Sequence, residues 1–284
     1  MLCLRVISVG TCLFLSLCGF GAVAPHASRL KTGLAVYALG GQADERLFIP
    51  LAAKKSPPPV GKPLISDNAN NTQPSLSPDG KTLVYVSDRS GRTDLYRVSL
   101  PDGVPEKLTE TPTADEETPV FSPDGSSVAF ASNRTGDWDI YRVNLADGVT
   151  ELAVGDPGSD EVHPNFMPDG HKLLFSSNRH DRNWDIYSTT TVSGIWTRLI
   201  DSAAVERFPT VARDGTIVAF RYENSGNSDV YVMDVAARRR VRVTSHPAFD
   251  GYPVLTPDGS GLVFVSTRGA GRGLYSVNLG GSGL

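Results

Sequence analysis

Ser122-Pro123-Asp124-Gly125, Ser132-Asn133-Arg134-Thr135-Gly136 and Asp139-Ile140-Tyr141 follow one another in a stretch of sequence that returns along the chain. Its anchor, Pro-Asp-Gly, also stands at residues 78–80, 168–170 and 257–259, and residues 213–215 keep two of its three residues. From aspartate to aspartate, the steps from 79 through 124, 169 and 214 to 258 are 45, 45, 45 and 44 residues. Proline presets φ, aspartate bonds its own backbone and glycine accepts a positive φ, so each anchor predicts a tight turn between antiparallel strands.

Four short strands are predicted around each anchor. One strand leads into the turn, and an aliphatic strand such as Val128-Ala129-Phe130-Ala131 leaves it. A polar turn follows, with an arginine in four of the copies, and a third strand opens with Asp-x-Tyr. A short outer strand such as Glu106-Lys107-Leu108-Thr109 completes the unit. Four-stranded units that repeat every 45 or so residues are typical of β-propellers.

We therefore expect an all-β fold, a six-bladed β-propeller of four-stranded blades. Residues 34–38 resemble residues 82–86 and indicate a degenerate first copy, while the last copy lacks its outer strand. Residues 28–31 would supply that strand, so that the N-terminal segment closes the ring and removes exposed strand edges. Five blades with a long N-terminal strap is the competing count. The expected repeats, within one propeller domain over residues 25–284, are 34–71, 72–116, 117–161, 162–206, 207–250 and 251–284.

The N-terminus has the pattern of an export segment. Arg5 is the only charge in the first 24 residues, and residues 6–24 are mostly apolar. We expect residues 1–24 to be a signal peptide or a lipoprotein or anchor segment, although a buried helix is the alternative. Three outcomes stay open: cleavage near Ala24 or Ala27, lipidation at Cys18, and an uncleaved segment that tethers the protein to a membrane. Each outcome places the rest of the chain outside the cytoplasm, for example in the periplasm.

Composition and motifs exclude several classes of function. Apolar residues make up 40% and charged residues 20% of the chain, and the formal net charge of -4 gives no basic face for nucleic acid. All three cysteines lie within the first eighteen residues, so the body of the chain has no disulfide and no cysteine metal site. Neither Gly-x-Ser-x-Gly nor His-Glu-x-x-His occurs. We expect no enzyme, and a propeller that is monomeric.

The repeated units resemble the PD40 (WD40-like) repeats of the TolB family, whose pattern is Ser-Pro-Asp-Gly, an aliphatic strand, Ser-x-Arg-x-Gly and Asp-Ile-Tyr. The resemblance covers roughly residues 34–284 and rests on five copies in phase. It implies a periplasmic propeller that binds protein partners of the cell envelope, here without the α/β domain that precedes the propeller in TolB. The alternative is a polysaccharide-binding or sugar-lyase propeller similar to oligogalacturonate lyases.

A variable column of residues is the first candidate binding surface. The inner strands of a propeller line its channel, and the residues before their prolines differ from copy to copy, as a specific surface requires. Aromatic residues and arginine are typical of the residues that dominate protein interfaces. The candidate partner-binding residues at the channel mouth are His163, Arg207, Phe208 and Tyr252. The alternative is tolerated variation of a loop.

A column of acids stands three residues before those prolines and is the second candidate site. Like charges gathered at one level repel unless a cation or donor groups lie among them. The candidate ligands, whose oxygen atoms would suit calcium as a divalent cation in the channel, are Glu116, Glu161, Glu206 and Asp250. The alternative is that each acid accepts hydrogen bonds from nearby backbone amides.

Overall fold

The computed structural model describes residues 3–9, 12–18, 48–49, 62–190, 194–256, 258–269 and 271–280, with side chains from residue 64 onward. All regular structure in these ranges is β-strand, which confirms the predicted all-β fold. None of the described residues lies in a helix that is long and apolar enough to span a membrane. The chain divides into two compact units, Met1–Pro119 and Val120–Leu284, and the boundary falls within one strand, β9.

The first unit contains two small hairpins and one four-stranded sheet. The hairpins pair β1 (Cys3–Val9) with β2 (Cys12–Cys18) and β3 (Phe48–Ile49) with β4 (Lys62–Pro63). The sheet has the order β5-β6-β7-β8, and its strands are β5 (Asn71–Leu76), β6 (Thr82–Ser87), β7 (Asp94–Ser99) and β8 (Glu106–Lys107). All of these neighbours are antiparallel.

Four further sheets follow in sequence. The sheet at the boundary consists of β9 (Glu116–Phe121), β10 (Ser127–Ser132), β11 (Asp139–Asn144) and β12 (Thr150–Val154). The next consists of β13 (Glu161–Phe166), β14 (Lys172–His180), β15 (Asn183–Thr190) and β16 (Trp196–Arg198). Then come β17 (Val205–Val211), β18 (Ile217–Asn224), β19 (Asn227–Asp234) and β20 (Arg240–Arg242). The last sheet has three strands, β21 (Asp250–Leu255), β22 (Gly261–Ser266) and β23 (Gly273–Asn278).

The prediction of six blades is wrong, because the described residues form five sheets of this type, four with four strands and one with three. In the expected first copy, only Phe48–Ile49 and Lys62–Pro63 pair as strands among the described residues, and each strand is two residues long. Its sequence has neither a Pro-Asp-Gly turn nor an Asp-x-Tyr segment, whereas each of the five sheets has at least one of them. Residues 28–31 and 34–38, which were expected to close the ring and to open that blade, lie outside the described residues.

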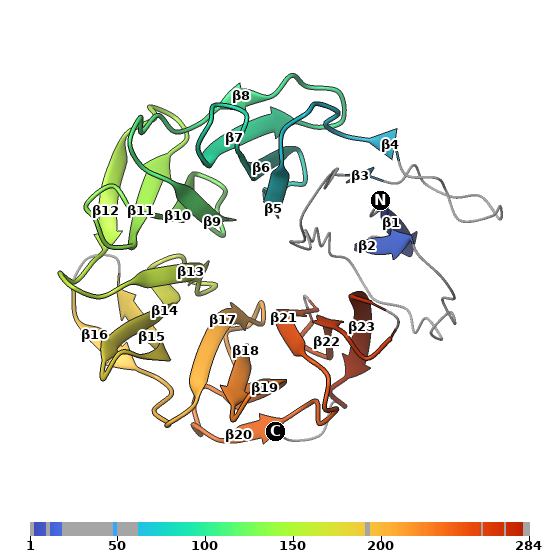
Figure 1. Cartoon of the computed structure of the whole chain (residues 1–284), viewed down its shortest axis with the longest axis vertical. Helices are drawn as coiled ribbons and strands as arrows, with labels where there is room; N and C mark the ends of the chain where they lie inside the picture. The colour runs from blue at the N-terminus through green and yellow to red at the C-terminus, as the bar shows by residue number, and fades with distance from the viewer. Residues whose placement is uncertain are drawn as a thin grey trace. The chain divides into compact units, whose positions relative to one another are not determined.

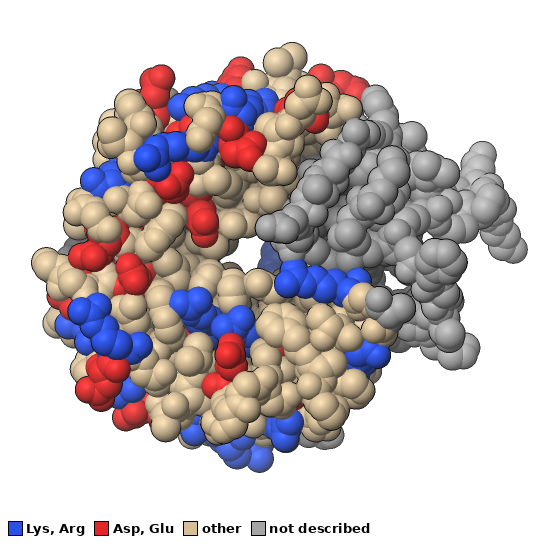
Figure 2. Space-filling model, in the orientation of Figure 1, with Lys and Arg blue, Asp and Glu red and all other residues tan. Residues whose placement is uncertain are grey.

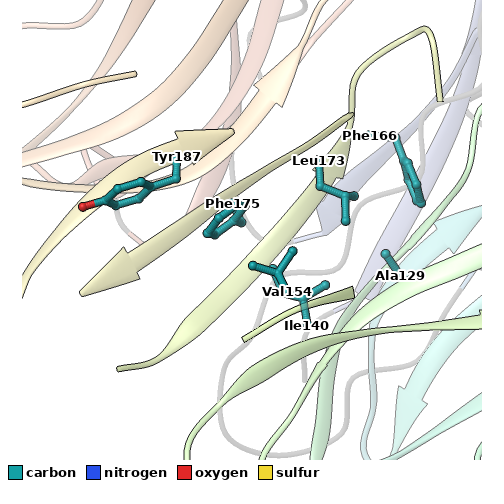
Figure 3. Packing of buried hydrophobic residues seen from close by; sticks show 7 residues of the cluster. All are labelled: Ala129, Ile140, Val154, Phe166, Leu173, Phe175 and Tyr187. Carbon is teal, nitrogen blue, oxygen red and sulfur yellow. The ribbon is translucent and has the colours of Figure 1, made fainter. Parts of the chain in front are cut away.

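Within the second unit, apolar layers join successive sheets face to face. Figure 3 shows one of them between the sheet of β10–β12 and that of β13–β15. It consists of Ala129, Ile140, Val154, Phe166, Leu173, Phe175 and Tyr187, all of them buried. Similar layers follow between the next pairs of sheets, around Phe220 and around Phe264. The middle strands of these sheets, such as β10, β14 and β22, are accordingly buried along most of their length, as expected for stacked blades.

The first strands of the sheets lie beside one another in the second unit. β13 contacts β17, and β17 contacts β21. Figure 1 shows these three strands on one side of the unit, whereas β16 and β20 lie on the opposite side. We call β5, β9, β13, β17 and β21 the inner strands. In this unit the inner strands of successive sheets therefore lie side by side.

The anchor turns form as the sequence predicts. In the boundary sheet, Asp124 Oδ1 accepts hydrogen bonds from Ser122 Oγ at 2.6 Å and from the Ser126 amide at 3.0 Å. These bonds stabilise the charged carboxylate and lower the pKa of Asp124 to about 2. The Gly125 amide donates to the Ser122 carbonyl at 2.9 Å, and Gly125 has a φ of 73°. The equivalent Gly170 has a φ of 70°.

We predict that Gly170→Ala destabilises the fold by about 1–2 kcal/mol, the cost of a left-handed backbone at a residue with a Cβ. Crowding is not the cause, because an added Cβ would meet nothing closer than Pro123 Cδ at 3.8 Å. Gly170→Asn is the matched variant, and its loss should be smaller because asparagine tolerates this conformation. Urea unfolding measures both losses, and an alanine variant as stable as wild type would contradict the account.

Candidate functional site

A β-bulge interrupts β5, β13, β17 and β21 at the residue before the proline. Proline has no amide hydrogen for the ladder, so a proline within a sheet requires an edge or a bulge. In the second unit the register shifts between Val162 and Asn165, between Arg207 and Thr210, and between Gly251 and Val254. The residue before each proline, which we call the bulge residue, has a positive φ between 49° and 57°: Gln73, Thr118, His163, Phe208 and Tyr252.

The bulge residues of the second unit contact one another from sheet to sheet. The ring centroids of His163 and Phe208 are 3.8 Å apart, and those of Phe208 and Tyr252 are 4.5 Å apart in an edge-to-face arrangement. Phe249, just before β21, lies 5.8 Å from Tyr252. We call these four residues the aromatic rim. His163 and Phe208 are half-buried, whereas 38% of Tyr252 is exposed. Tyr252 is therefore the residue of the rim that solvent reaches most.

The same contact between neighbours occurs in the first unit, with polar groups. The bulge residue Gln73 accepts a hydrogen bond on Oε1 from the backbone amide of Thr118, the bulge residue of the next sheet. The bulge thus brings equivalent positions together in both units. The side chains at those positions decide whether the contact is polar or aromatic.

Two arginines lie against the aromatic rim. Arg207 on β17 and Arg221 on β18 are direct partners in the antiparallel ladder. Arg207 Cζ lies 3.6 Å from the ring centroid of Trp184, on β15 of the preceding sheet. Arg221 Cζ lies 5.2 Å from the ring centroid of Phe208 and 5.9 Å from that of Phe249. We call Arg207 and Arg221 the arginine pair.

The electrostatics of this region are positive. Burial, followed by the charge of Arg221, lowers the pKa of Arg207 to about 10, although Glu223 and Asp160 partly offset the effect. Burial, followed by the charges of Arg207 and Arg221, also holds the pKa of His163 well below its usual value. His163 is therefore neutral at physiological pH, and the guanidinium groups carry the charge of the site.

The structure brings together the four residues predicted to bind a partner. His163, Phe208 and Tyr252 form one continuous contact, and Arg207 adjoins Phe208 along the chain and stacks on Trp184. Their role in binding a partner stays a prediction. The proximity follows from the bulge, which places one side chain of each inner strand beside its counterpart in the next sheet.

Sequence reasoning missed four members of the cluster: Trp184, Arg221, Phe249 and Gly251. A Cβ on Gly251 would lie 2.7 Å from Phe249 Cζ and 3.1 Å from Arg221 Cδ, so a larger residue would force the Phe249 side chain to move. Arg221 could have been found by comparing the second strands. Its column holds Val86, Ala131, Ser176 and Val265 in the other copies, and arginine is the exception.

The predicted metal-ligating acids are buried, and each is bonded to groups close by. Glu116 accepts hydrogen bonds from Thr109 and Thr111, the latter at 2.5 Å. Glu161 accepts bonds from Ser159 Oγ at 2.7 Å, from Ser177 Oγ at 2.8 Å and from the Asp156 amide at 3.1 Å. The structure thus surrounds these two carboxylates with hydroxyl and amide donors.

The other two acids have arginine neighbours. Glu206 accepts a hydrogen bond from Ser202, and its Oε1 lies 3.8 Å from Arg240 Nη1. Asp250 Oδ2 accepts a bond from Arg268 Nη2 at 2.6 Å. Among the described residues, no group of three or more His, Cys, Asp or Glu side chains is arranged to hold a metal ion. That these acids bind a divalent cation stays a prediction.

Burial raises the pKa of two of these acids. The pKa of Glu161 is raised to about 7 by burial, which outweighs its hydrogen-bond donors. The pKa of Glu206 is also raised to about 7, first by burial and then by the nearby Asp185 carboxylate, against the pull of Ser202 and Arg240. Both groups therefore change charge near neutral pH.

Comparison with known proteins identifies similar propellers. Residues 112–220 match the PD40 family, the TolB beta propeller domain. TolB from Acinetobacter baumannii is 27% identical with a TM-score of 0.67, over 77% of this chain and 54% of that one, so this chain spans about half of that protein. The putative TolB from Agrobacterium tumefaciens is 25% identical with a TM-score of 0.67, over 78% and 82%. An oligogalacturonate lyase in complex with manganese shares the fold at 19% identity, with a TM-score of 0.59 over 78% and 69%.

We predict that Glu161 makes the fold less stable as the pH rises from 4.5 toward about 7. In that window the unfolded chain has lost the proton and the folded chain still holds it. The free energy of unfolding therefore falls, by up to about 1.4 kcal/mol per pH unit from one group. Glu161→Gln, which stays neutral, should flatten this slope in urea unfolding at a series of pH values. Glu151→Gln on β12, where the side chain is exposed, is the control and should keep the wild-type slope. Equal slopes in Glu161→Gln and wild type would refute the assignment.

Proposed function

We propose that this TolB-like protein of PD40 propeller repeats is a non-catalytic binding scaffold outside the cytoplasm. It engages a protein partner of the cell envelope through one face of the propeller. The observation that carries the proposal is the aromatic rim, where His163, Phe208 and Tyr252 from three successive sheets meet.

The composition of the rim supports binding to a protein. Aromatic residues and arginine dominate the energetics of protein interfaces, because they bury a large area and add directional contacts. The aromatic rim and the adjacent arginine pair supply both kinds of residue, and Tyr252 is among the few large hydrophobic residues that are exposed in the described part of the chain. Rigid inner strands keep the ordering cost of binding low.

The lyase reading has less support. The oligogalacturonate lyase that shares the fold binds manganese. In this chain, burial and then the charges of Arg207 and Arg221 lower the pKa of His163, and its ring packs against Phe208. No observation on the described residues favours cleavage of a sugar over binding of a protein.

We predict that Phe208→Ala combined with Tyr252→Ala abolishes capture of a specific envelope protein. Wild type and variant, immobilised at equal density, are compared in affinity capture from envelope extract followed by mass spectrometry. The control carries Val149→Ala and Ile195→Ala, which also removes two exposed apolar side chains, 60% and 73% exposed, from outside the rim. The control should capture the same protein as wild type. A partner that binds the rim variant and wild type equally would remove the rim from the proposal.

The location outside the cytoplasm is proposed from the apolar segment over residues 6–24. We predict that the full chain, fused at its C-terminus to alkaline phosphatase without a leader, gives active phosphatase, because that enzyme needs an oxidising compartment to form its disulfides. Replacing Leu13, Leu15 and Leu17 by arginine should abolish the activity. An inactive wild-type fusion that accumulates in the cytoplasm would contradict the proposed location.

A further inference from the structure

The two members of the arginine pair differ in how their charge is compensated among the described residues. Arg207 and Arg221 are direct cross-strand partners, whose Cβ atoms in such a ladder lie about 5 Å apart on one face. Like charges in this position are destabilising. Arg221 Nη2 has an ion-pair partner in Glu223 Oε2 at 3.1 Å. Among the described residues, no carboxylate forms an ion pair with Arg207, although its side chain is half-buried.

The stacking on aromatic rings determines where a ligand could bind. Trp184 covers one face of the Arg207 guanidinium at 3.6 Å, and Phe208 and Phe249 lie against that of Arg221. A guanidinium donates its hydrogen bonds in its own plane, so stacking leaves the edge free to donate. The Nε atoms of both arginines are buried, and neither has a hydrogen-bond partner among the described residues. Arg207 thus combines a charge that has no ion-pair partner among the described residues with a buried Nε–H that has no acceptor there.

The surrounding groups favour an anion that also carries apolar surface. His163 is neutral, and the rim adds aromatic surface next to the two cations. Figure 2 shows basic side chains gathered on this face of the second unit, over the inner part of β17. A carboxylate has two oxygens in a plane and matches the fork of a guanidinium. A phosphate is more strongly hydrated, and a sugar would need several acceptors for its hydroxyl groups, which rings and guanidinium groups do not supply.

We infer that the arginine pair and the aromatic rim form a binding site for a carboxylate that a protein partner presents next to an aromatic or other apolar side chain. This inference rests on the proposed function and names the chemical group that the partner supplies. The carboxylate accepts hydrogen bonds from the edge of Arg207, and the neighbouring apolar side chain packs on Phe208 and Tyr252. The negative charge of the carboxylate also offsets the repulsion between the two guanidinium groups.

The test uses three acetylated pentapeptides and saturation-transfer NMR titration of the full chain. The first peptide has an aspartate between two phenylalanines and an amidated C-terminus. The second has asparagine in place of the aspartate. The third has asparagine but a free C-terminal carboxylate after phenylalanine, so the first and third separate a side-chain source from a chain terminus. We expect at least one acidic peptide to bind about tenfold more tightly than the neutral peptide, the gain from one charge-assisted hydrogen bond.

Variants assign the effect to the arginine pair. Arg207→Gln should lower the affinity for whichever acidic peptide binds wild type to the affinity for the neutral peptide. The affinity for the neutral peptide should not change. Arg207→Lys keeps the charge without the planar fork, so its affinity should be intermediate. The matched control is Arg213→Gln, which removes an exposed arginine from the turn between β17 and β18. Circular dichroism verifies that each variant is folded.

Three results would overturn the inference: equal affinity for the acidic and neutral peptides, an acidic preference that survives in Arg207→Gln, and tighter binding of digalacturonate than of either acidic peptide. The last result would assign the site to an acidic sugar. The proposed function fails separately, when envelope capture is unchanged by removing Phe208 and Tyr252. If that variant loses capture and Arg207→Gln retains both capture and acidic-peptide binding, the scaffold function stands and the carboxylate site does not.

Discussion

A proline within an inner strand is the constraint on which the candidate site depends. It removes one donor from the ladder, and the chain accommodates this with a bulge whose residue has a left-handed backbone. Such a conformation costs on the order of 1–3 kcal/mol for a residue other than glycine, and it recurs at the same position in all five sheets. Because the bulges are in phase, neighbouring bulge residues meet. Gln73 Oε1 accepts a hydrogen bond from the Thr118 backbone amide, and the ring of Phe208 contacts both His163 and Tyr252.

An arginine that follows the second strand makes hydrogen bonds near the bulge in several sheets. The candidate site lies at the sheet of β17–β20, where this arginine is missing. In the last sheet, Arg268 bonds Ser266 at 2.9 Å and Asp250 at 2.6 Å while its guanidinium covers the ring of Tyr275. Arg89 makes equivalent bonds and contacts in the sheet of β5–β8. The sheet of β17–β20 lacks that arginine; Tyr222 packs on Tyr231 with centroids 4.5 Å apart, and the adjacent Arg221 lies against the rim. The loss of a structural arginine is thus accompanied by the gain of one beside the candidate site.

Periodicity was enough to predict the all-β fold, the anchor turns and the residues of the rim on the inner strands, because each depends on local turn chemistry and on a shared column. Arg221, Phe249 and Trp184 could not be found that way, since their proximity depends on packing between different strands. The blade count failed because residues 34–71 resemble a repeat in hydrophobic pattern but lack its turn and its Asp-x-Tyr segment. The repeat also placed the four acids at equivalent positions. Their burial, and the donors nearest to Glu161 and Asp250, could be found only from the structure.

The central claim is that in-phase bulges gather side chains from successive sheets into one rim. Nuclear Overhauser effects between aromatic protons test it directly in solution. The account predicts cross-peaks from Phe208 to both His163 and Tyr252, whose ring centroids are 3.8 Å and 4.5 Å from that of Phe208. A folded protein in which Phe208 shows neither cross-peak would contradict the account.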